Sequence, residues 1–188
     1  MRVKVDALLR LVEARAAALK PQTTAAHGTN SSTTKALPKS NVIAYSGGVD
    51  STLAATIVHQ VFPETTVACL GISPSLSQQQ LQQARDIAAH INVPLWTCHT
   101  TESQNEHYVA NTGQSCYYCK TNLYTTINEV AEFAMGKLGD GKVKPVLYNG
   151  TNADDQLDPT RLGLVAASQF EVVSPLSQLT KSEVREGV

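Results

Sequence analysis

Residues 45–52, Tyr-Ser-Gly-Gly-Val-Asp-Ser-Thr, decide the fold of this 188-residue chain. The apolar run 42–45 leads into this stretch, and apolar residues spaced four apart over 53–61 lead out of it, which predicts a strand, a glycine turn and a helix. The first N–H groups of a helix lack intrahelical partners and carry partial positive charge, so such a turn accepts phosphate. We therefore predict a pyrophosphate-binding loop formed by Ser46, Gly47, Gly48, Val49, Asp50, Ser51 and Thr52.

Asp50 is the unusual member of this loop, because a carboxylate repels phosphate unless a cation lies between them. Mg²⁺ prefers carboxylate and phosphate oxygens, so we assign Asp50 to Mg²⁺. The chain contains neither Gly-x-x-x-x-Gly-Lys-Ser/Thr nor Gly-x-Gly-x-x-Gly, which excludes a Walker loop and a dinucleotide fingerprint.

Composition narrows the class of protein. With 15 basic and 16 acidic residues the net charge is −1, so the chain has no basic footprint and nucleic acid is not an expected partner. No apolar run is long enough to predict a membrane span. Four cysteines do not suggest a secreted disulfide framework, and we expect a reducing cytoplasmic setting.

The remaining sequence alternates strand and helix patterns. Within an N-terminal segment 1–20 a helix is predicted over 4–19, and residues 21–40 form a flexible insertion of low complexity. A polar, irregular stretch is expected at 102–113, and helices are expected to start near Ser77, Cys116 and Thr180, the first and last with capping boxes. The pattern predicts an α/β fold with an open parallel sheet of about five strands and helices on both faces, with strands at 42–45, 67–72, 93–97, 146–148 and 172–173.

The loop after the fourth predicted strand, residues 149–155, offers amides, hydroxyls and two adjacent carboxylates. It should meet the glycine loop, because the carboxyl ends of parallel strands share one edge of the sheet. Asp154 and Asp155 are therefore candidate Mg²⁺ ligands, and the alternative is a loop with an Asp helix cap.

Cys116 and Cys119 form a Cys-x-x-Cys pair whose role the sequence leaves open. The pair could be a redox or sulfur-carrying site, half of a zinc site, or a structural pair at a helix start. Zinc would need two further ligands, and the spacing of the nearby candidates is irregular, so neither zinc nor an iron–sulfur cluster is expected.

The 46–52 loop resembles the signature of the PP-loop ATP pyrophosphatases, and further segments resemble one branch of them, the LarE family of ATP-dependent sulfur transferases. These segments are Cys116-Tyr-Tyr-Cys-Lys120, Gly150-Thr-Asn-Ala-Asp-Asp155, Arg161-x-Gly163, Ser174-Pro-Leu176 and Thr180-Lys-x-Glu183. The resemblance implies an adenine nucleotide alpha hydrolase-like, Rossmann-like domain over 41–188, truncated at the C-terminus.

The resemblance also implies a reaction. ATP would bind the glycine loop, Gly150, Thr151 and the loop near Ser73 and Ser75, together with Mg²⁺. A pyridinium carboxylate mononucleotide would attack the α-phosphate, giving an acyl-adenylate and pyrophosphate, with Asp50, Lys120 and Arg161 as the catalytic residues. Sulfur would then be transferred, in the family from a downstream cysteine segment that we expect this chain to lack.

Three alternatives stay open at this stage. One is a tRNA thiolase, another an amide-forming synthetase of the NAD or GMP type, and the third a catalytically dead nucleotide-binding module. A small-molecule carboxylate is the expected partner, and we also expect a homo-oligomer.

Overall fold

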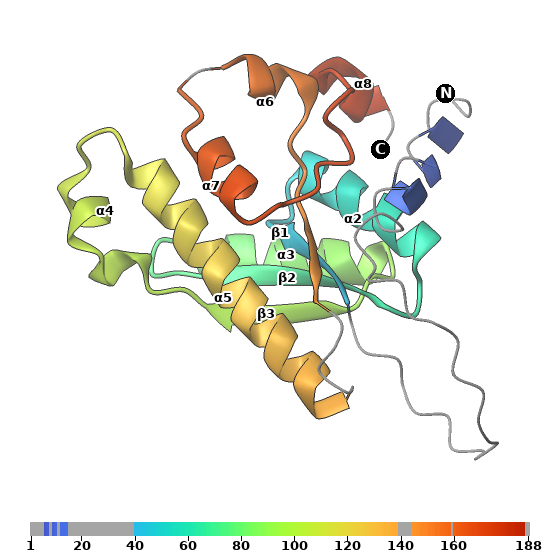
Figure 1. Cartoon of the computed structure of the whole chain (residues 1–188), viewed down its shortest axis with the longest axis horizontal. Coiled ribbons are helices and arrows are strands. Elements are labelled where there is room, and N and C mark those ends of the chain that lie inside the picture. The colour runs from blue at the N-terminus through green and yellow to red at the C-terminus, as the bar shows by residue number, and fades with distance from the viewer. Residues whose placement is uncertain are drawn as a thin grey trace.

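The computed structural model describes residues 6–7, 9–10, 12–14, 40–138, 144–158 and 160–186. Its centre is a parallel sheet in the order β3-β2-β1-β4 (Figure 1), so the α/β prediction is confirmed. The direction of the chain across the sheet reverses beside β1, and this is where open parallel sheets bind ligands. The strands are β1 (Asn41–Tyr45), β2 (Thr66–Ile72), β3 (Leu95–His99) and β4 (Val146–Tyr148).

The predicted fifth strand at 172–173 is wrong, and the sheet of the described residues has four strands. Val173 forms only an isolated parallel bridge with Tyr148. Glu171, just before it, has a left-handed φ of 52°, and Pro175, just after it, has no N–H to donate. Pairing is therefore interrupted on both sides of Val173.

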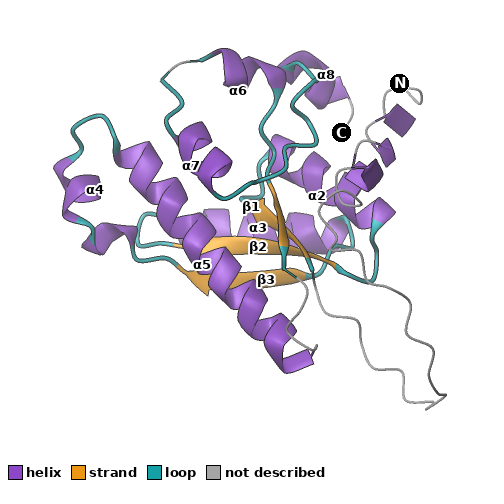
Figure 2. Cartoon of the chain, in the orientation of Figure 1, coloured by secondary structure: helices purple, strands orange, loops and turns teal. Residues whose placement is uncertain are grey.

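Helices cover both faces of the sheet, as predicted (Figure 2). Alternate residues of a strand point to opposite faces. In β1, Ile43 belongs to the apolar cluster that contains residues of α2 (Val49–Val61) and α3 (Gln78–His90). Val42, its neighbour, belongs to the cluster that contains residues of α5 (Ser115–Leu138). The sheet edge at the end of β1 therefore lies between two helical layers.

Both predicted capping boxes are confirmed. At the start of α3 the Ser77 hydroxyl accepts from the Gln80 amide at 3.2 Å, and the Gln80 side chain accepts from the Ser77 amide at 3.1 Å. At the start of α8 (Lys181–Glu186), Thr180 and Glu183 exchange the same two bonds. Local sequence therefore fixes where these two helices begin.

The stretch 102–113 is more regular than predicted, with a 3₁₀ turn η1 (Glu102–Gln104) and the helix α4 (Glu106–Ala110). Asn105 caps α4 by accepting from two backbone amides, a local signal that polarity alone concealed. Two short helices were not assigned from the sequence: α6 (Ala153–Leu157), for which only a helix cap was given as an alternative, and α7 (Gly163–Gln169). Strand β3 begins two residues later than expected.

At the N-terminus, the described residues between 6 and 14 are helical, and Val12 is buried in the cluster shared with α2 and α3. The predicted insertion at 21–40 lies outside the described residues except for Ser40. Among the helices that the structure describes, none combines the length and apolarity that a bilayer span requires.

Candidate nucleotide-binding site

The glycine loop between β1 and α2 is held by its own serines and by α3. The hydroxyl groups of Ser46 and Ser51 lie 3.2 Å apart, and the Ser51 hydroxyl also donates to the Gly48 carbonyl at 3.0 Å. Gly47 has a φ of 76°, and a Cβ added there would lie 2.8 Å from the backbone of Ala84. A side chain at Gly47 would therefore be strained and would also collide with α3. Packing of α3 sets the shape of this turn.

Helix α2 begins without a side-chain cap. Its N-cap is Gly48, whose backbone is extended (φ −75°, ψ 159°), and no side chain forms a capping hydrogen bond there. The first helical bond runs from the Thr52 amide to the Gly48 carbonyl at 2.9 Å. The amides that precede Thr52 in the helix therefore remain available to an anion, and the helix dipole favours negative charge there.

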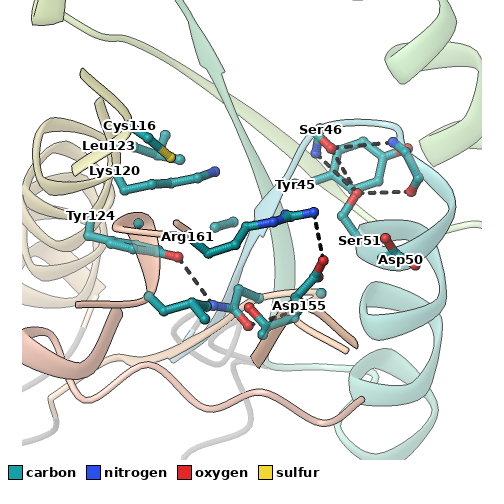
Figure 3. Close-up of a pocket in the computed structure, with 17 residues that line it drawn as sticks. Tyr45, Ser46, Asp50, Ser51, Cys116, Lys120, Leu123, Tyr124, Asp155 and Arg161 are labelled. Carbon is teal, nitrogen blue, oxygen red and sulfur yellow. Dashed lines mark hydrogen bonds and ion pairs between the residues drawn. The ribbon is translucent and has the colours of Figure 1, made fainter. Parts of the chain in front are cut away.

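A pocket of about 280 Å³ opens beside this helix start (Figure 3). It lies between the carboxyl ends of β1 and β4 and the first turns of α5, so it brings together residues from all three motifs found in the sequence. Its lining comprises Ala44, Tyr45, Ser46, Gly48, Asp50, Ser51, Cys116, Lys120, Leu123, Tyr124, Asn149, Gly150, Thr151, Asp155, Arg161, Gly163 and Leu164.

The loop after β4 lies directly against the glycine loop. A Cβ at Gly150 would be 2.6 Å from the Asp50 carbonyl carbon and 2.6 Å from the Ser51 nitrogen, so only glycine permits this approach. Asn149, which is buried, fixes the loop: its side-chain oxygen accepts from the Thr151 amide at 3.1 Å. Two segments about 100 residues apart in sequence thus form one wall.

Asn149 also ties this wall to α5. Its side-chain amide donates to the Tyr124 hydroxyl at 3.2 Å, and its oxygen accepts from the Ser174 hydroxyl at 2.7 Å. Burial raises the pKa of Tyr124, and the Asn149 hydrogen bond partly opposes that rise. The phenol is therefore neutral near pH 7 and holds the pocket side of α5 in place.

Two cations face the helix start from the opposite side. Arg161 forms an ion pair with Asp155, Nη2 to Oδ1, at 2.9 Å (Figure 3), and lies 3.7 Å from Asp158. Lys120 comes from α5, where a Cβ on Gly163 would lie 2.9 Å from its side chain, so α7 packs closely on this helix. The pocket therefore presents positive charge across from the amides of α2.

The two candidate metal carboxylates of the 149–155 loop diverge. Asp155 lines the pocket, whereas Asp154 does not, and its Oδ2 accepts from the Lys181 amide at the start of α8 at 2.7 Å. The helix cap proposed as an alternative is present, but the capping residue is Asn152, with Asp155 as its capping-box partner.

Some of the other predicted site residues line the pocket and others do not. Asp50 and Cys116 line the pocket, and Cys116 is exposed. Cys119, one helical turn further on, is half-buried outside the lining, and burial raises the pKa of its thiol. The residues that do not line the pocket are Gly47, Val49, Thr52, Ser73, Ser75, Asp154 and Cys119. Ser73 and Ser75 lie just beyond the end of β2, with their hydroxyl groups 2.7 Å apart.

Sequence reasoning missed Ala44, Tyr45, Leu123, Tyr124 and Leu164 as lining residues, and it expected Asn149 only as part of the 149–155 loop. The α5 residues had a readable signal, because positions 116, 120, 123 and 124 follow helical spacing and share one helix face. Tyr45 had the weaker signal of lying at the end of a predicted strand.

Mg²⁺ suits this pocket through Asp50. Its carboxylate makes no hydrogen bond or ion pair with another described residue, and it lies in the first turn of the uncapped helix. Within the described parts of the chain no three His, Cys, Asp or Glu side chains gather as a metal site. Mg²⁺ does not need such a cage, since one or two carboxylates with phosphate oxygens and water suffice.

An open parallel sheet with this serine–glycine turn opening into a helix defines an α/β protein of the PP-loop type. The model of the NAD synthase family matches residues 26–144. The chain belongs to the NAD synthase family.

Two curated proteins also match this chain in sequence. An uncharacterized protein of Synechocystis is 37% identical over 147 residues, covering 77% of this chain and 52% of the relative. The chain spans about half the length of the curated relatives that it matches.

Two solved structures share the fold. The NH3-dependent NAD synthetase of Campylobacter jejuni superposes with a TM-score of 0.57 at 18% identity, covering 98% of this chain and 70% of that one. The U34-tRNA thiolase NcsA of Methanococcus maripaludis, a structure that contains a [4Fe-4S] cluster, gives 0.59 at 15% identity, covering 98% and 63%.

Proposed function

We propose that this protein uses ATP to adenylate a carboxylate substrate, releasing pyrophosphate, and that the activated carboxyl group then accepts sulfur, as in the LarE family. One observation carries the proposal: the uncapped start of α2, with Asp50 in its first turn, faces Lys120 and Arg161 across a single pocket. Amides and cations on opposite walls suit a reaction between two anions.

The reaction balances as a displacement at phosphorus. A substrate carboxylate oxygen bonds to the α-phosphorus of ATP, the bond to the bridging oxygen breaks, and pyrophosphate leaves with its electron pair. The α2 amides would hold the phosphates, and Lys120 and Arg161 would offset charge on the substrate and the leaving group. Asp50 would hold Mg²⁺, which would neutralise phosphate charge when bound. Ser73 and Ser75, at the end of β2, are proposed contacts for the nucleoside part.

The substrate class follows from the LarE resemblance, which points to a pyridinium carboxylate mononucleotide. Cys116 is proposed to contact this substrate, because it lines the pocket beside Lys120 and Gly163. Cys119 is proposed to pack rather than react, since it lies outside the lining with a raised pKa. Neither cysteine is assigned as the sulfur donor. A cytoplasmic setting and a homo-oligomer remain predictions.

Amide formation is the second candidate, and the match to the NAD synthase family favours it. Both reactions share the adenylation step and differ in the nucleophile that follows, ammonia or a sulfur nucleophile. In either case the nucleophile would bond to the carbonyl carbon, and AMP would leave with the electron pair of the broken C–O bond. The product formed with each nucleophile therefore distinguishes them.

The test is turnover of [α-³²P]ATP by the full chain with a pyridinium carboxylate mononucleotide and Mg²⁺. We expect labelled AMP or acyl-adenylate and one pyrophosphate for each, and we expect Asp50→Asn to reduce the rate at low Mg²⁺. The matched control is Asp86→Asn, an exposed carboxylate on α3 outside the pocket. Binding of ATP without turnover would overturn the proposal and favour a catalytically dead module.

A further inference from the structure

The two carboxylates of the pocket are in different chemical situations. The carboxylate of Asp50 has no hydrogen bond or ion pair with another described residue. Both oxygens of Asp155 are engaged: Oδ1 is 2.9 Å from Arg161 Nη2, and Oδ2 accepts from the Asn152 amide at 3.3 Å. A Mg²⁺ ion at Asp155 would compete with Arg161 for the charge of the same carboxylate, whereas at Asp50 it meets no such competitor among the described residues.

Asp155 is also the fixed member of its pair. Its side chain is 12% exposed against 48% for Arg161, and its own amide donates to the Asn152 side chain at 2.9 Å. The capping box thus sets the direction of the Asp155 carboxylate before any ligand arrives. Arg161 is long and half-exposed, so a single anchored carboxylate limits the positions its guanidinium can adopt.

A second carboxylate supports the same guanidinium. Asp158 Oδ2 lies 3.7 Å from Arg161 Nε, while Asp158 Oδ1 accepts from the Thr160 hydroxyl at 2.6 Å and the Thr160 amide at 2.9 Å. The Thr160 hydrogen bonds, with a smaller effect from Arg161, hold the pKa of Asp158 below its usual value. Arg161 therefore lies between two oriented carboxylates and still lines the pocket.

We propose that Asp155 is a positioning residue that aims the Arg161 guanidinium at the phosphate and carboxylate groups bound in the pocket, and that it is not a Mg²⁺ ligand. This inference rests on the proposed function, whose anions Arg161 would contact. It assigns the metal to Asp50 and the anion contact to the Asp155–Arg161 pair. Lys120 also lines the pocket and makes no ion pair with another described residue, so it too is available to an anion.

The test is a double-mutant cycle with Asp155→Asn and Arg161→Lys, measured by calorimetric binding of inorganic pyrophosphate. Asn at 155 keeps an oxygen for the Asn152 amide, so the helix cap survives while the charge and the acceptor that faces Arg161 are lost. We expect each single variant to weaken pyrophosphate binding about tenfold, as for loss of one charge-assisted hydrogen bond, and the double variant to be no weaker than either. Losses that multiply would overturn the inference.

Titration with Mg²⁺ distinguishes a residue that positions Arg161 from a residue that binds the metal ion. Asp50→Asn should raise the Mg²⁺ concentration needed for half-maximal ATP binding, whereas Asp155→Asn should leave it unchanged. An equal rise in both variants would make Asp155 a metal ligand and overturn the inference.

A third measurement does not depend on ligand binding. Phenylglyoxal modifies exposed guanidinium groups, and peptide mass spectrometry reports the rate at Arg161 relative to Arg85 on α3. Asp155→Asn should raise the relative rate at Arg161 by about two- to fivefold, and Asp86→Asn should not. An unchanged rate would overturn the inference. The wild type could bind pyrophosphate, and the variants could show the expected non-additive losses, without any turnover of ATP. That result would overturn the proposed function and leave the role of Asp155 standing.

Discussion

Helices α2 and α3 both follow parallel strands and pack on the same face of the sheet, yet their first turns are built differently. In α3 the Ser77 and Gln80 side chains satisfy two free amides by reciprocal hydrogen bonds. In α2 the N-cap is Gly48, and no side chain forms a capping hydrogen bond there. A capped helix end is complete within the protein, whereas an uncapped one beside a pocket retains donors for a ligand. The difference separates a structural helix start from a binding one.

The largest effect should come from the turn that leads into the uncapped helix. Gly47→Ala places a Cβ at φ 76° and 2.8 Å from Ala84, and should lower the free energy of unfolding by about 3 kcal/mol. Gly113→Ala is the matched control, because φ there is 86° and a Cβ would meet no atom within 4 Å. It should cost about 1 kcal/mol. Equal losses in urea unfolding would show that α3 does not shape the loop.

A second variant makes α2 resemble α3. Gly48→Asp supplies a capping carboxylate on a backbone already extended, so the first-turn amides gain an internal acceptor and the pocket gains a negative charge. Pyrophosphate binding, measured by calorimetry, should weaken by tenfold or more, as for about 1.4 kcal/mol. The free energy of unfolding should rise by a few tenths of a kcal/mol.

Gly48→Ala is the control for that variant, since it adds a Cβ 3.4 Å from the Ser46 hydroxyl oxygen but no capping acceptor. If both variants bind pyrophosphate as tightly as the wild type, the α2 amides do not hold phosphate.

The converse variant uncaps α3. Ser77→Ala removes the acceptor of the Gln80 amide and should lower the free energy of unfolding by about 1 kcal/mol. Pyrophosphate affinity should be unchanged, because neither residue lines the pocket. A loss of affinity without a loss of stability would contradict the division between the two helix starts.

The smallest effect is expected at α8. Thr180→Ala removes the hydroxyl that accepts from the Glu183 amide, but the Asp154 carboxylate still accepts from the Lys181 amide. The loss of stability should therefore be about 0.5 kcal/mol. Combining it with Asp154→Ala, which removes the acceptor of the Lys181 amide, should give more than the sum of the two single losses, and simple additivity would show that the two acceptors act independently.

Sequence reasoning recovered the elements whose signals are local. The glycine turn, both capping boxes and the alternation of strand and helix follow from neighbouring residues, and the structure confirms them. It failed at 172–173, where two apolar residues resemble a strand but the backbone on both sides cannot continue the pairing. Short helices such as α6 and α7 were missed because few residues carry too little periodicity to read.

The composition of the pocket was harder to predict than its place. The meeting of the glycine loop and the 149–155 loop at one sheet edge follows from parallel topology, so Asp50 and Gly150 were expected there. Lys120 and Arg161 were expected there from the family resemblance. Tyr124 was not, because its contribution depends on how α5 is rotated against the sheet. The roles of these residues stay predictions that the variants above address.

The sequence by itself determined three features of the fold. These are an anion-accepting turn after a strand, the residues at which two capped helices begin, and the edge of the sheet where the loops meet. Only the tertiary structure decided which polar groups face that edge. Asp154 and Asp155 are neighbours, but successive side chains on a helix differ by about 100° in direction. One therefore lies at the start of α8 and the other in the pocket against Arg161. That choice depends on packing between distant elements, which no local pattern records.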